Sequence, residues 1–216
     1  MTEHAFEPMR RAMVASQLRT TGVNDPRVVA AMGAVERERF VPQACQALAY
    51  ADALVPLGNG RQLNSPMALG LLLTEARLSG SERALLIGAA TGYGAAVLAL
   101  LVREVVALEE DEALAADAEA ALAGTGVTVV RGPLAKGWAD GAPYDFILID
   151  GSVGQLPQAI IDQVVEGGTI ALALDDGGAT RLGVGKVAAG AFGANLFTDA
   201  AAAALPGFEQ PRGFSF

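Results

Sequence analysis

The stretch 84-ALLIGAATGYGAAVLALLV-102 decides the fold. An aliphatic run precedes a loop of small residues that is broken by Gly88, Gly92 and Gly94, and an unbroken apolar run follows. That order predicts a buried strand, a tight turn and a helix, because glycine supplies the backbone freedom that a sharp turn needs. Ligands of open α/β sheets bind outside the carboxyl ends of the strands, so we expect the turn at 88–92 to bind a ligand.

The turn lacks the features that bind phosphate. A dinucleotide-binding turn of the form G-x-G-x-x-G would have glycine where Ala90 stands, and nothing here resembles a P-loop. No Lys or Arg lies between Ala84 and Val102. The backbone N–H groups of the turn therefore suit a ligand without phosphate groups.

The second strand ends in acidic residues, 105-VVALEED-111. Glu109 lies 17 positions after Gly92, close to the offset of about 20 at which a carboxylate accepts hydrogen bonds from ribose hydroxyls. A ribose without phosphate indicates S-adenosyl-methionine, whose positive sulfonium an acidic protein does not repel. The alternative for the acidic run alone is a helix N-terminus, where the macrodipole favours Glu and Asp. For turn and acid together we favour a cofactor site.

After Gly80, strand and helix patterns alternate. We expect strands at 83–87, 104–109, 127–130, 144–149 and 169–174, and helices at about 92–102, 111–123 and 155–165. This alternation predicts a mostly parallel sheet covered on both faces, a three-layer Rossmann-like α/β fold. The short apolar pieces between glycines after 174 predict an antiparallel C-terminal edge, and the run Ala200–Ala204 is simply low in complexity.

Helices also begin the chain. We expect helices at 6–20 and 25–35, a turn-rich region at 36–65, and a helix at 66–78 that begins at Ser65-Pro66. A length of 216 residues suits one domain, 1–216. Within it, 1–80 would form an N-terminal helical and substrate-loop region and 81–216 the cofactor-binding α/β core.

Composition narrows the function classes. The formal net charge is −9 and the pI about 4.6, and the 15 Lys and Arg do not cluster along the sequence, so we expect no nucleic-acid partner. Apolar segments are broken before the ~20 residues that span a bilayer, and the N-terminus does not look like a secretory signal, which predicts a cytoplasmic protein without a membrane helix. With one cysteine, Cys45, and one histidine, His4, we expect no disulfide, no metal site of the Cys/His type and no histidine base.

Longer stretches carry the pattern of a known family over nearly the whole chain. They are 14-VASQLRTTGVNDPRVVAAMGAVERERFVP-42, 50-YADALVPLG-58, 60-GRQLNSP-66, 87-IGAATGYGAAVLA-99, 144-YDFILID-150 and 167-GGTIAL-172. On these motifs the sequence resembles the protein-L-isoaspartate O-methyltransferases, within the class I S-adenosyl-methionine-dependent methyltransferases. The resemblance implies methyl transfer to the side-chain carboxylate of isoaspartyl residues, a first step in protein repair, with an isoaspartyl peptide or protein as partner.

The resemblance also implies roles for single residues. Gly88 and Gly92 match the cofactor turn, Glu109 matches the ribose-binding acid, and Gly60 and Pro66 bracket the catalytic loop. Further cofactor contacts are expected at Ala90, Thr91, Tyr93, Glu110, Gly132, Pro133 and Asp150. Substrate-loop contacts are expected at Gln62 and Leu63, and catalytic roles at Ser65 and Asn64.

Several positions depart from the family pattern. Asn64 stands where members usually have a hydroxyl residue, with Ser65 one place late, and Leu86 replaces an acid at the end of the first strand. Pro133 stands where an adenine-contacting aspartate is usual, and Asp150 where an uncharged residue is usual. Each missing carboxylate removes a charge-assisted hydrogen bond of about 1.5–3 kcal/mol.

These departures leave two alternatives open. One is a non-catalytic protein of this fold that has lost the cofactor, and the other is a methyltransferase with a different acceptor. The hydroxyl of Ser65 has two interpretations as well, a substrate contact or the cap of the helix at 66–78.

Overall fold

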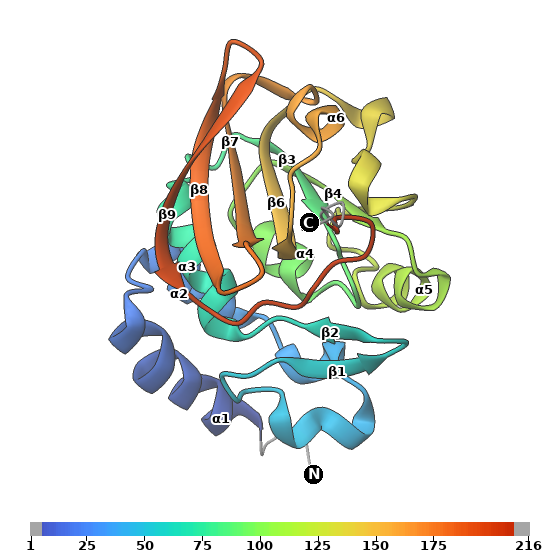
Figure 1. Ribbon diagram of the computed structural model, residues 1–216. Coiled ribbons are helices and arrows are strands. Elements are labelled where there is room, and N and C mark those ends of the chain that lie inside the picture. The colour runs from blue at the N-terminus through green and yellow to red at the C-terminus, as the bar shows by residue number, and fades with distance from the viewer. Residues whose placement is uncertain (1–5, 210–216) are drawn as a thin grey trace, which may run out of the picture.

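The computed structural model describes residues 6–209, and its centre is a seven-stranded sheet (Figure 1). The strand order is β5-β4-β3-β6-β7-β8-β9. Pairing is parallel from β5 to β7, and antiparallel between β7 and β8 and between β8 and β9. The strands are β3 (Arg83–Ile87), β4 (Glu104–Glu109), β5 (Thr128–Arg131), β6 (Tyr144–Val153), β7 (Val164–Asp175), β8 (Thr180–Ala188) and β9 (Ala191–Asp199). The mostly parallel α/β sheet and its antiparallel C-terminal edge are confirmed.

A separate two-stranded hairpin lies outside the carboxyl ends of these strands. Its strands are β1 (Val55–Gly58) and β2 (Arg61–Leu63), which pair antiparallel. The helices are α1 (Phe6–Ala12), α2 (Pro26–Ala34), α3 (Pro66–Ala76), α4 (Tyr93–Leu98), α5 (Glu112–Ala121) and α6 (Gln158–Ile161). Shorter helical turns are η2 (Met13–Leu18), η3 (Arg19–Thr21), η4 (Arg37–Phe40), η5 (Gln43–Leu48), η6 (Leu134–Lys136) and η7 (Ala139–Gly141).

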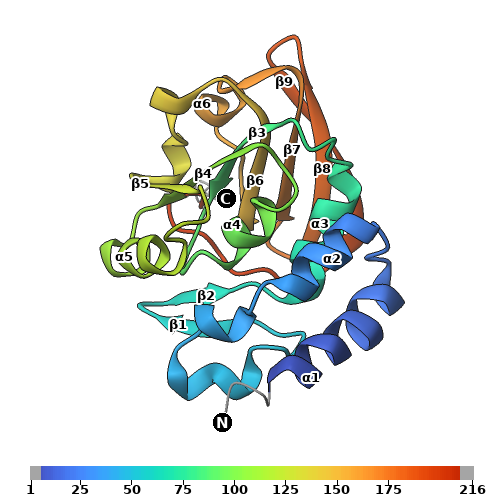
Figure 2. The same cartoon turned by 180° about the vertical axis from the view of Figure 1, so that it is seen from behind.

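The two faces of the sheet are covered differently. On one face, side chains such as Leu86 and Phe146 pack with residues of the helices that precede and follow β3, among them α2, α3 and α4. Figure 2 shows these three helices on one side of the sheet. On the other face, Leu85 and Ile147 pack with residues of η6 and α6 and with Leu205 from the segment that follows β9. Both faces are covered as expected, but short turns and an irregular segment do this on the second face.

The predicted helix at 155–165 is wrong in most of its length. Only α6 is α-helical, and β7 already begins at Val164, which pairs with Tyr144 of β6. There are two physical reasons. Pro157 stands directly before α6 and interrupts the expected helix near its start. The β-branched pair Val164-Val165 fits a pleated strand better than a helix. The strands at 144–149 and 169–174 are correspondingly longer than expected.

The low-complexity run at 200–204 has a defined place. After β9 the chain passes between the carboxyl ends of the parallel strands and the β1–β2 hairpin (Figure 1). Ala204 forms an isolated parallel bridge with Ser152 of β6. The run therefore belongs to the region where a ligand is expected, which its composition did not indicate.

Within residues 6–209, no helix is both long enough and apolar enough to cross a bilayer. Cys45 is half-buried and packs against the core, while His4 lies outside the described residues.

Candidate functional site

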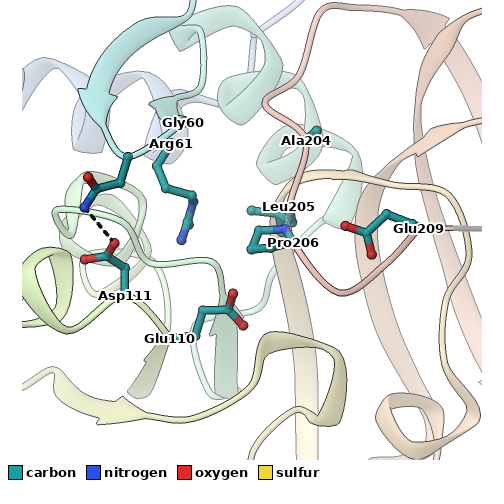
Figure 3. A pocket seen from close by; sticks show the side chains of 9 residues that line it. Gly60, Arg61, Glu110, Asp111, Ala204, Leu205, Pro206 and Glu209 are labelled. Atoms are coloured by element: carbon teal, nitrogen blue, oxygen red, sulfur yellow. Dashed lines mark hydrogen bonds between the residues drawn. The ribbon is translucent and has the colours of Figure 1, made fainter.

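The strand order reverses between β3 and β6, which makes a topological switch point. Ligands of open α/β sheets bind outside the carboxyl ends of the strands at such a point. A cavity of about 440 Å³ lies in this region, between the β1–β2 turn, the residues after β4 and the segment after β9 (Figure 3). Its lining residues are Asn59, Gly60, Arg61, Glu110, Asp111, Ala204, Leu205, Pro206 and Glu209.

Glu109, the predicted ribose-binding acid, ends β4 and is fully buried. The guanidinium of Arg61 donates two hydrogen bonds to it, 2.5 Å long to Oε1 and 2.9 Å long to Oε2. The backbone N–H groups of Ala90, Glu110 and Asp111 also donate to it, over 2.7, 2.9 and 3.0 Å. A carboxylate offers about four lone-pair directions, so these five donors saturate it.

The glycine turn is bonded largely to the protein itself. Ala90 has a left-handed φ of 49°, which costs an L residue of order 1 kcal/mol, and this conformation aims its N–H at Glu109. Gly88 and the residue after it both donate to the carbonyl oxygen of Leu108, and Gly92 donates to a carbonyl within the turn. Four of the five backbone N–H groups at 88–92 therefore have partners inside the chain. Their expected role in binding a cofactor stays a prediction.

The side chain of Leu205 covers this turn. A Cβ atom built on Gly88 would lie 2.9 Å from Leu205 Cδ2, and one built on Gly151 would lie 2.5 Å from Leu205 Cγ. Gly88 follows β3 and Gly151 lies near the end of β6, so Leu205 sits at the switch point itself. It is 5% exposed, and burying a leucine side chain contributes about 1.5–3 kcal/mol.

Backbone hydrogen bonds hold the segment around Leu205 in place. The N–H of Ser152 donates to the carbonyl of Ala203 over 2.7 Å, and the N–H of Leu205 donates back to the carbonyl of Ser152 over 3.0 Å. Asn64 adds a side-chain contact, since its Oδ1 accepts from the N–H of Ala203 over 2.7 Å. The segment is thereby tied to both β6 and the predicted catalytic loop.

Asn64 also binds Asp150, the acid at the fourth predicted strand. Its Nδ2 donates to Asp150 Oδ1 over 2.7 Å, and both side chains are buried. Burial raises the pKa of Asp150, while the Asn64 hydrogen bond and the charges of Arg37 and Arg61 act in the opposite direction. Gly94 makes room for this carboxylate, because a Cβ there would lie 2.4 Å from Asp150 Oδ2. Asn64 thus bridges Asp150 and the C-terminal segment.

The two predicted hydroxyl residues have structural partners. Ser65 is the N-cap of α3, where its Oγ accepts from the N–H of Ala68 over 3.3 Å. Thr91 donates its hydroxyl to the carbonyl of Phe40 over 2.6 Å. Neither residue lines the cavity beside Arg61. The cap interpretation of Ser65 has its contact in the structure, and a catalytic role for Ser65 stays a prediction.

Other predicted cofactor contacts lie at the edges of the site. Glu110 lines the cavity, and its Oε2 accepts from the N–H of Leu134 over 3.2 Å. Gly132 and Pro133 lead from β5 into η6, beside the ring of Trp138. They therefore lie next to the cavity wall that Glu110 forms.

The other predicted residues divide between core and loop. Tyr93 is buried at the start of α4, with the guanidinium of Arg37 4.5 Å from its ring centroid. Gln62 and Leu63 belong to β2, where Leu63 joins the core and Gln62 is half-buried. Gly60 lines the cavity with a φ of 75°.

Sequence reasoning missed Arg61 and Leu205. Arg61 stands directly after Gly60 in the quoted loop, yet the turn at 88–92 appeared free of cations because only its own neighbours in sequence were considered. Leu205 follows an alanine run that gave no periodic signal. The charge of Arg61 was the one available hint, because a basic side chain needs a partner when it is buried.

In this arrangement of side chains, two of the places that S-adenosyl-methionine, the cofactor implied by the sequence, would occupy are already filled. The carboxylate for the ribose is saturated while Arg61 is bonded to Glu109. The space beside Gly88 is filled by Leu205. The space that stays open is the cavity lined by Gly60 and Glu110, next to the predicted ribose-binding acid Glu109.

Comparison with known proteins shows the family. The model of the family described as "Protein-L-isoaspartate(D-aspartate) O-methyltransferase (PCMT)" matches residues 9–190. The chain is 42% identical over 171 residues to protein-L-isoaspartate O-methyltransferase 1 of Rhodopseudomonas palustris, which covers 78% of this chain and 70% of that protein. It is 39% identical over 174 residues to the protein-L-isoaspartate O-methyltransferase of Herpetosiphon aurantiacus, covering 79% and 78%.

Solved structures agree on the fold. A protein-L-isoaspartate O-methyltransferase structure superposes with a TM-score of 0.79 at 21% identity, covering 93% of this chain and 66% of that one. A putative protein-L-isoaspartate O-methyltransferase from Plasmodium falciparum, in complex with S-adenosyl-L-homocysteine, superposes with a TM-score of 0.77 at 17% identity, covering 91% and 97%. The resemblance seen in the sequence and the expected Rossmann-like methyltransferase fold are confirmed, and this chain belongs to the protein-L-isoaspartate O-methyltransferase family.

Proposed function

We propose that this chain is an S-adenosyl-methionine-dependent O-methyltransferase that acts on the side-chain carboxylate of isoaspartyl residues in damaged proteins. Its membership of the family and the 42% identity to a named enzyme support this activity. The structural observation that carries the proposal is Glu109, a buried carboxylate at the end of β4 beside the glycine turn. An acidic residue at this place in a Rossmann-like fold accepts hydrogen bonds from the hydroxyls of a ribose.

The reaction asks little acid or base chemistry of the protein. A carboxylate is already ionised and nucleophilic near neutral pH, so holding it in line with the methyl group does most of the catalysis. The cofactor supplies that methyl group. The absence of a histidine base among the described residues is therefore compatible with the activity.

Asn64 is the residue best placed to orient an acceptor from the loop. It lies between β2 and α3, and its amide can both donate and accept hydrogen bonds. In the present arrangement both ends of the amide have partners, Asp150 and Ala203. We propose that Asn64 replaces the usual hydroxyl residue of the loop.

The remaining sequence expectations are part of the same proposal. We propose a cytoplasmic protein with isoaspartyl peptides and proteins as partners and without nucleic acid. The net charge of −9 supports the last point.

Methyl transfer to a matched peptide pair tests the proposal. One peptide carries an isoaspartyl residue and its twin the normal aspartyl residue, and labelled S-adenosyl-methionine reports the transfer. We expect label on the isoaspartyl peptide and none on its twin. Equal labelling of both peptides, or none on either, would contradict the proposed acceptor.

A further inference from the structure

We propose that Arg61 and Leu205 hold the cofactor site of this chain in a self-closed form, so that S-adenosyl-methionine binds only after both side chains have withdrawn. This inference rests on the proposed function. Arg61 stands in for the ribose hydroxyls on Glu109, and Leu205 fills the space beside the glycine turn. The two contacts come from opposite sides of the site, the β1–β2 hairpin and the segment after β9.

The hydrogen bonds of Glu109 give the first argument. Three of its five donors are backbone N–H groups, which belong to the turn and to the end of β4 and stay when a ligand arrives. The other two come from Arg61. A ribose diol also presents two hydroxyl donors. They can bind the carboxylate oxygens of Glu109 that become available when Arg61 leaves. Arg61 and a ribose therefore compete for the same carboxylate.

The position of Leu205 gives the second argument. Its side chain lies against Gly88, which follows β3, and against Gly151 of β6, and these two strands flank the switch point of the sheet. The lack of a Cβ at both positions lets the leucine approach the backbone closely. The same close approach is what a ligand at the glycine turn needs. Leu205 and the amino-acid end of a cofactor therefore exclude one another.

The attachment of the two closing elements shows that they can leave without breaking the fold. The β1–β2 hairpin is a separate two-stranded sheet with no strand pairing to the seven-stranded one among the described residues. The segment around Leu205 is joined to β6 by the two backbone hydrogen bonds that make up the Ser152–Ala204 bridge, by the Ser152 hydroxyl, which donates to the carbonyl of Ala202, and by the N–H of Gly154, which donates to the carbonyl of Phe208. The side chain of Asn64 adds one more hydrogen bond, to the N–H of Ala203. Opening breaks these few contacts and leaves the ladder from β5 to β9 intact.

The charges of the cavity favour a cationic ligand once it opens. Arg61 is the one basic residue among those that line the cavity, whereas Glu110, Asp111 and Glu209 are acidic. When Arg61 withdraws, Glu109 is added to these carboxylates. A sulfonium together with an ammonium group then takes over the charge compensation that the guanidinium provides in the closed form.

A closed form of this kind weakens apparent affinity. If the open form is populated at about 1–10%, the apparent dissociation constant is about 10- to 100-fold higher than the intrinsic one. Variants that destabilise the closed form remove this factor. We expect Arg61→Gln and Leu205→Ala each to bind S-adenosyl-homocysteine about tenfold more tightly than the natural chain.

Titration calorimetry with S-adenosyl-homocysteine tests this, with two matched control variants. Arg131→Gln removes an arginine from surface ion pairs with Glu112 and Glu119, and Leu182→Ala removes a fully buried leucine of β8 that does not line the cavity. Both controls should bind like the natural chain. Binding by the natural chain that is equal to, or tighter than, binding by Arg61→Gln and Leu205→Ala would overturn the self-closed site and leave the proposed function standing. No binding by any of the five folded proteins at millimolar ligand would overturn both.

Hydrogen exchange on the unaltered chain is the second measurement, and it does not depend on how the variants fold. Saturating S-adenosyl-homocysteine should speed amide exchange in peptides that contain Leu205, because the bonds to Ser152 break. Exchange in the β8–β9 hairpin should not change. Unchanged or slower exchange around Leu205 at saturation would contradict the proposal.

Discussion

Arg61 and Glu109 form a bidentate ion pair, with N–O distances of 2.5 and 2.9 Å, although the two residues are 48 positions apart. The pair is buried, since the Arg61 side chain is 8% exposed and that of Glu109 is not exposed at all. The backbone N–H groups of Ala90, Glu110 and Asp111 satisfy the remaining acceptor positions of the Glu109 carboxylate. The pair fastens the β1–β2 hairpin to the end of β4, so it is both a structural contact and a barrier to ligand entry.

Replacing Glu109 by glutamine should destabilise the protein by about 1.5–3 kcal/mol, because Arg61 loses its charge-assisted hydrogen bonds and has to leave the site to reach solvent. Urea denaturation measures this as a lower midpoint. The double variant Arg61→Gln/Glu109→Gln should recover part of the loss, since it removes both charges.

The surface ion pair of Arg131 and Glu119 is the control for these variants of the buried pair. Both side chains are more than 40% exposed, so Glu119→Gln should cost no more than about 1 kcal/mol. A similarly small loss for Glu109→Gln would show that the buried pair contributes little to stability.

Replacing Ser65 by alanine should cost about 1 kcal/mol, the usual cost of losing an N-cap side chain. The rate of methyl transfer per folded molecule should stay within about twofold, because the hydroxyl is engaged with Ala68 at the start of α3. Thermal unfolding and steady-state kinetics on the same preparation separate the two effects. A large fall in kcat with unchanged stability would instead assign Ser65 to the reaction.

Replacing Asp150 by asparagine should make stability rise relative to the natural chain as the pH increases. Burial raises the pKa of Asp150 above its ordinary value of 3.8, so the folded protein holds this proton more tightly than the unfolded chain. The associated stability is present below about pH 3.8 and is lost as the pH rises through the higher folded value. Asparagine cannot ionise, and its Oδ1 still accepts from Asn64.

Denaturation midpoints at a series of pH values between 3 and 8 check this. The two proteins should differ least in acid and most at pH 8. Parallel stability curves over the whole range would mean that Asp150 titrates alike in both states.

Replacing Gly151 by alanine should destabilise the chain by about 1–3 kcal/mol, as overpacking of a filled site does. The new methyl group would lie 2.5 Å from Leu205 Cγ and 2.6 Å from the carbonyl oxygen of Ala203. Gly124→Ala is not overpacked, because nothing lies within 4 Å of its added methyl, although its φ of 81° brings backbone strain. Amide exchange around Leu205 should rise in Gly151→Ala and stay unchanged in Gly124→Ala. Equal exchange there in both variants would mean that Leu205 does not pack on Gly151.

Local patterns predicted most of the elements. The strands at 83–87 and 104–109 begin and end where expected, and Asp25 and Ser65 cap α2 and α3 beside their prolines. These features depend on neighbours within a few residues, where hydrophobic periodicity and capping act. The helix expected at 155–165 is wrong because Val164 pairs with Tyr144 of β6, and its β-branched side chain also favours a strand.

The candidate site was predicted only in part. Glu109 and the glycine turn lie side by side, as the spacing indicated, since Ala90 donates to Glu109. The partners that reach this pair from elsewhere, Arg61 and Leu205, were not predicted. The turn at 88–92 has no basic residue near it in the sequence, but the fold brings Arg61 to Glu109, the carboxylate beside this turn.

The sequence by itself determined the family and the alternation of strand, turn and helix that builds the sheet, together with the acid at the end of β4. Only the tertiary structure decided that Arg61 meets this acid and that Leu205 rests on Gly88, 117 positions earlier in the chain. The physical reason is that such contacts form when folding closes long loops and brings distant side chains to one edge of the sheet. Their energy depends on geometry and burial there, which short-range periodicity does not contain.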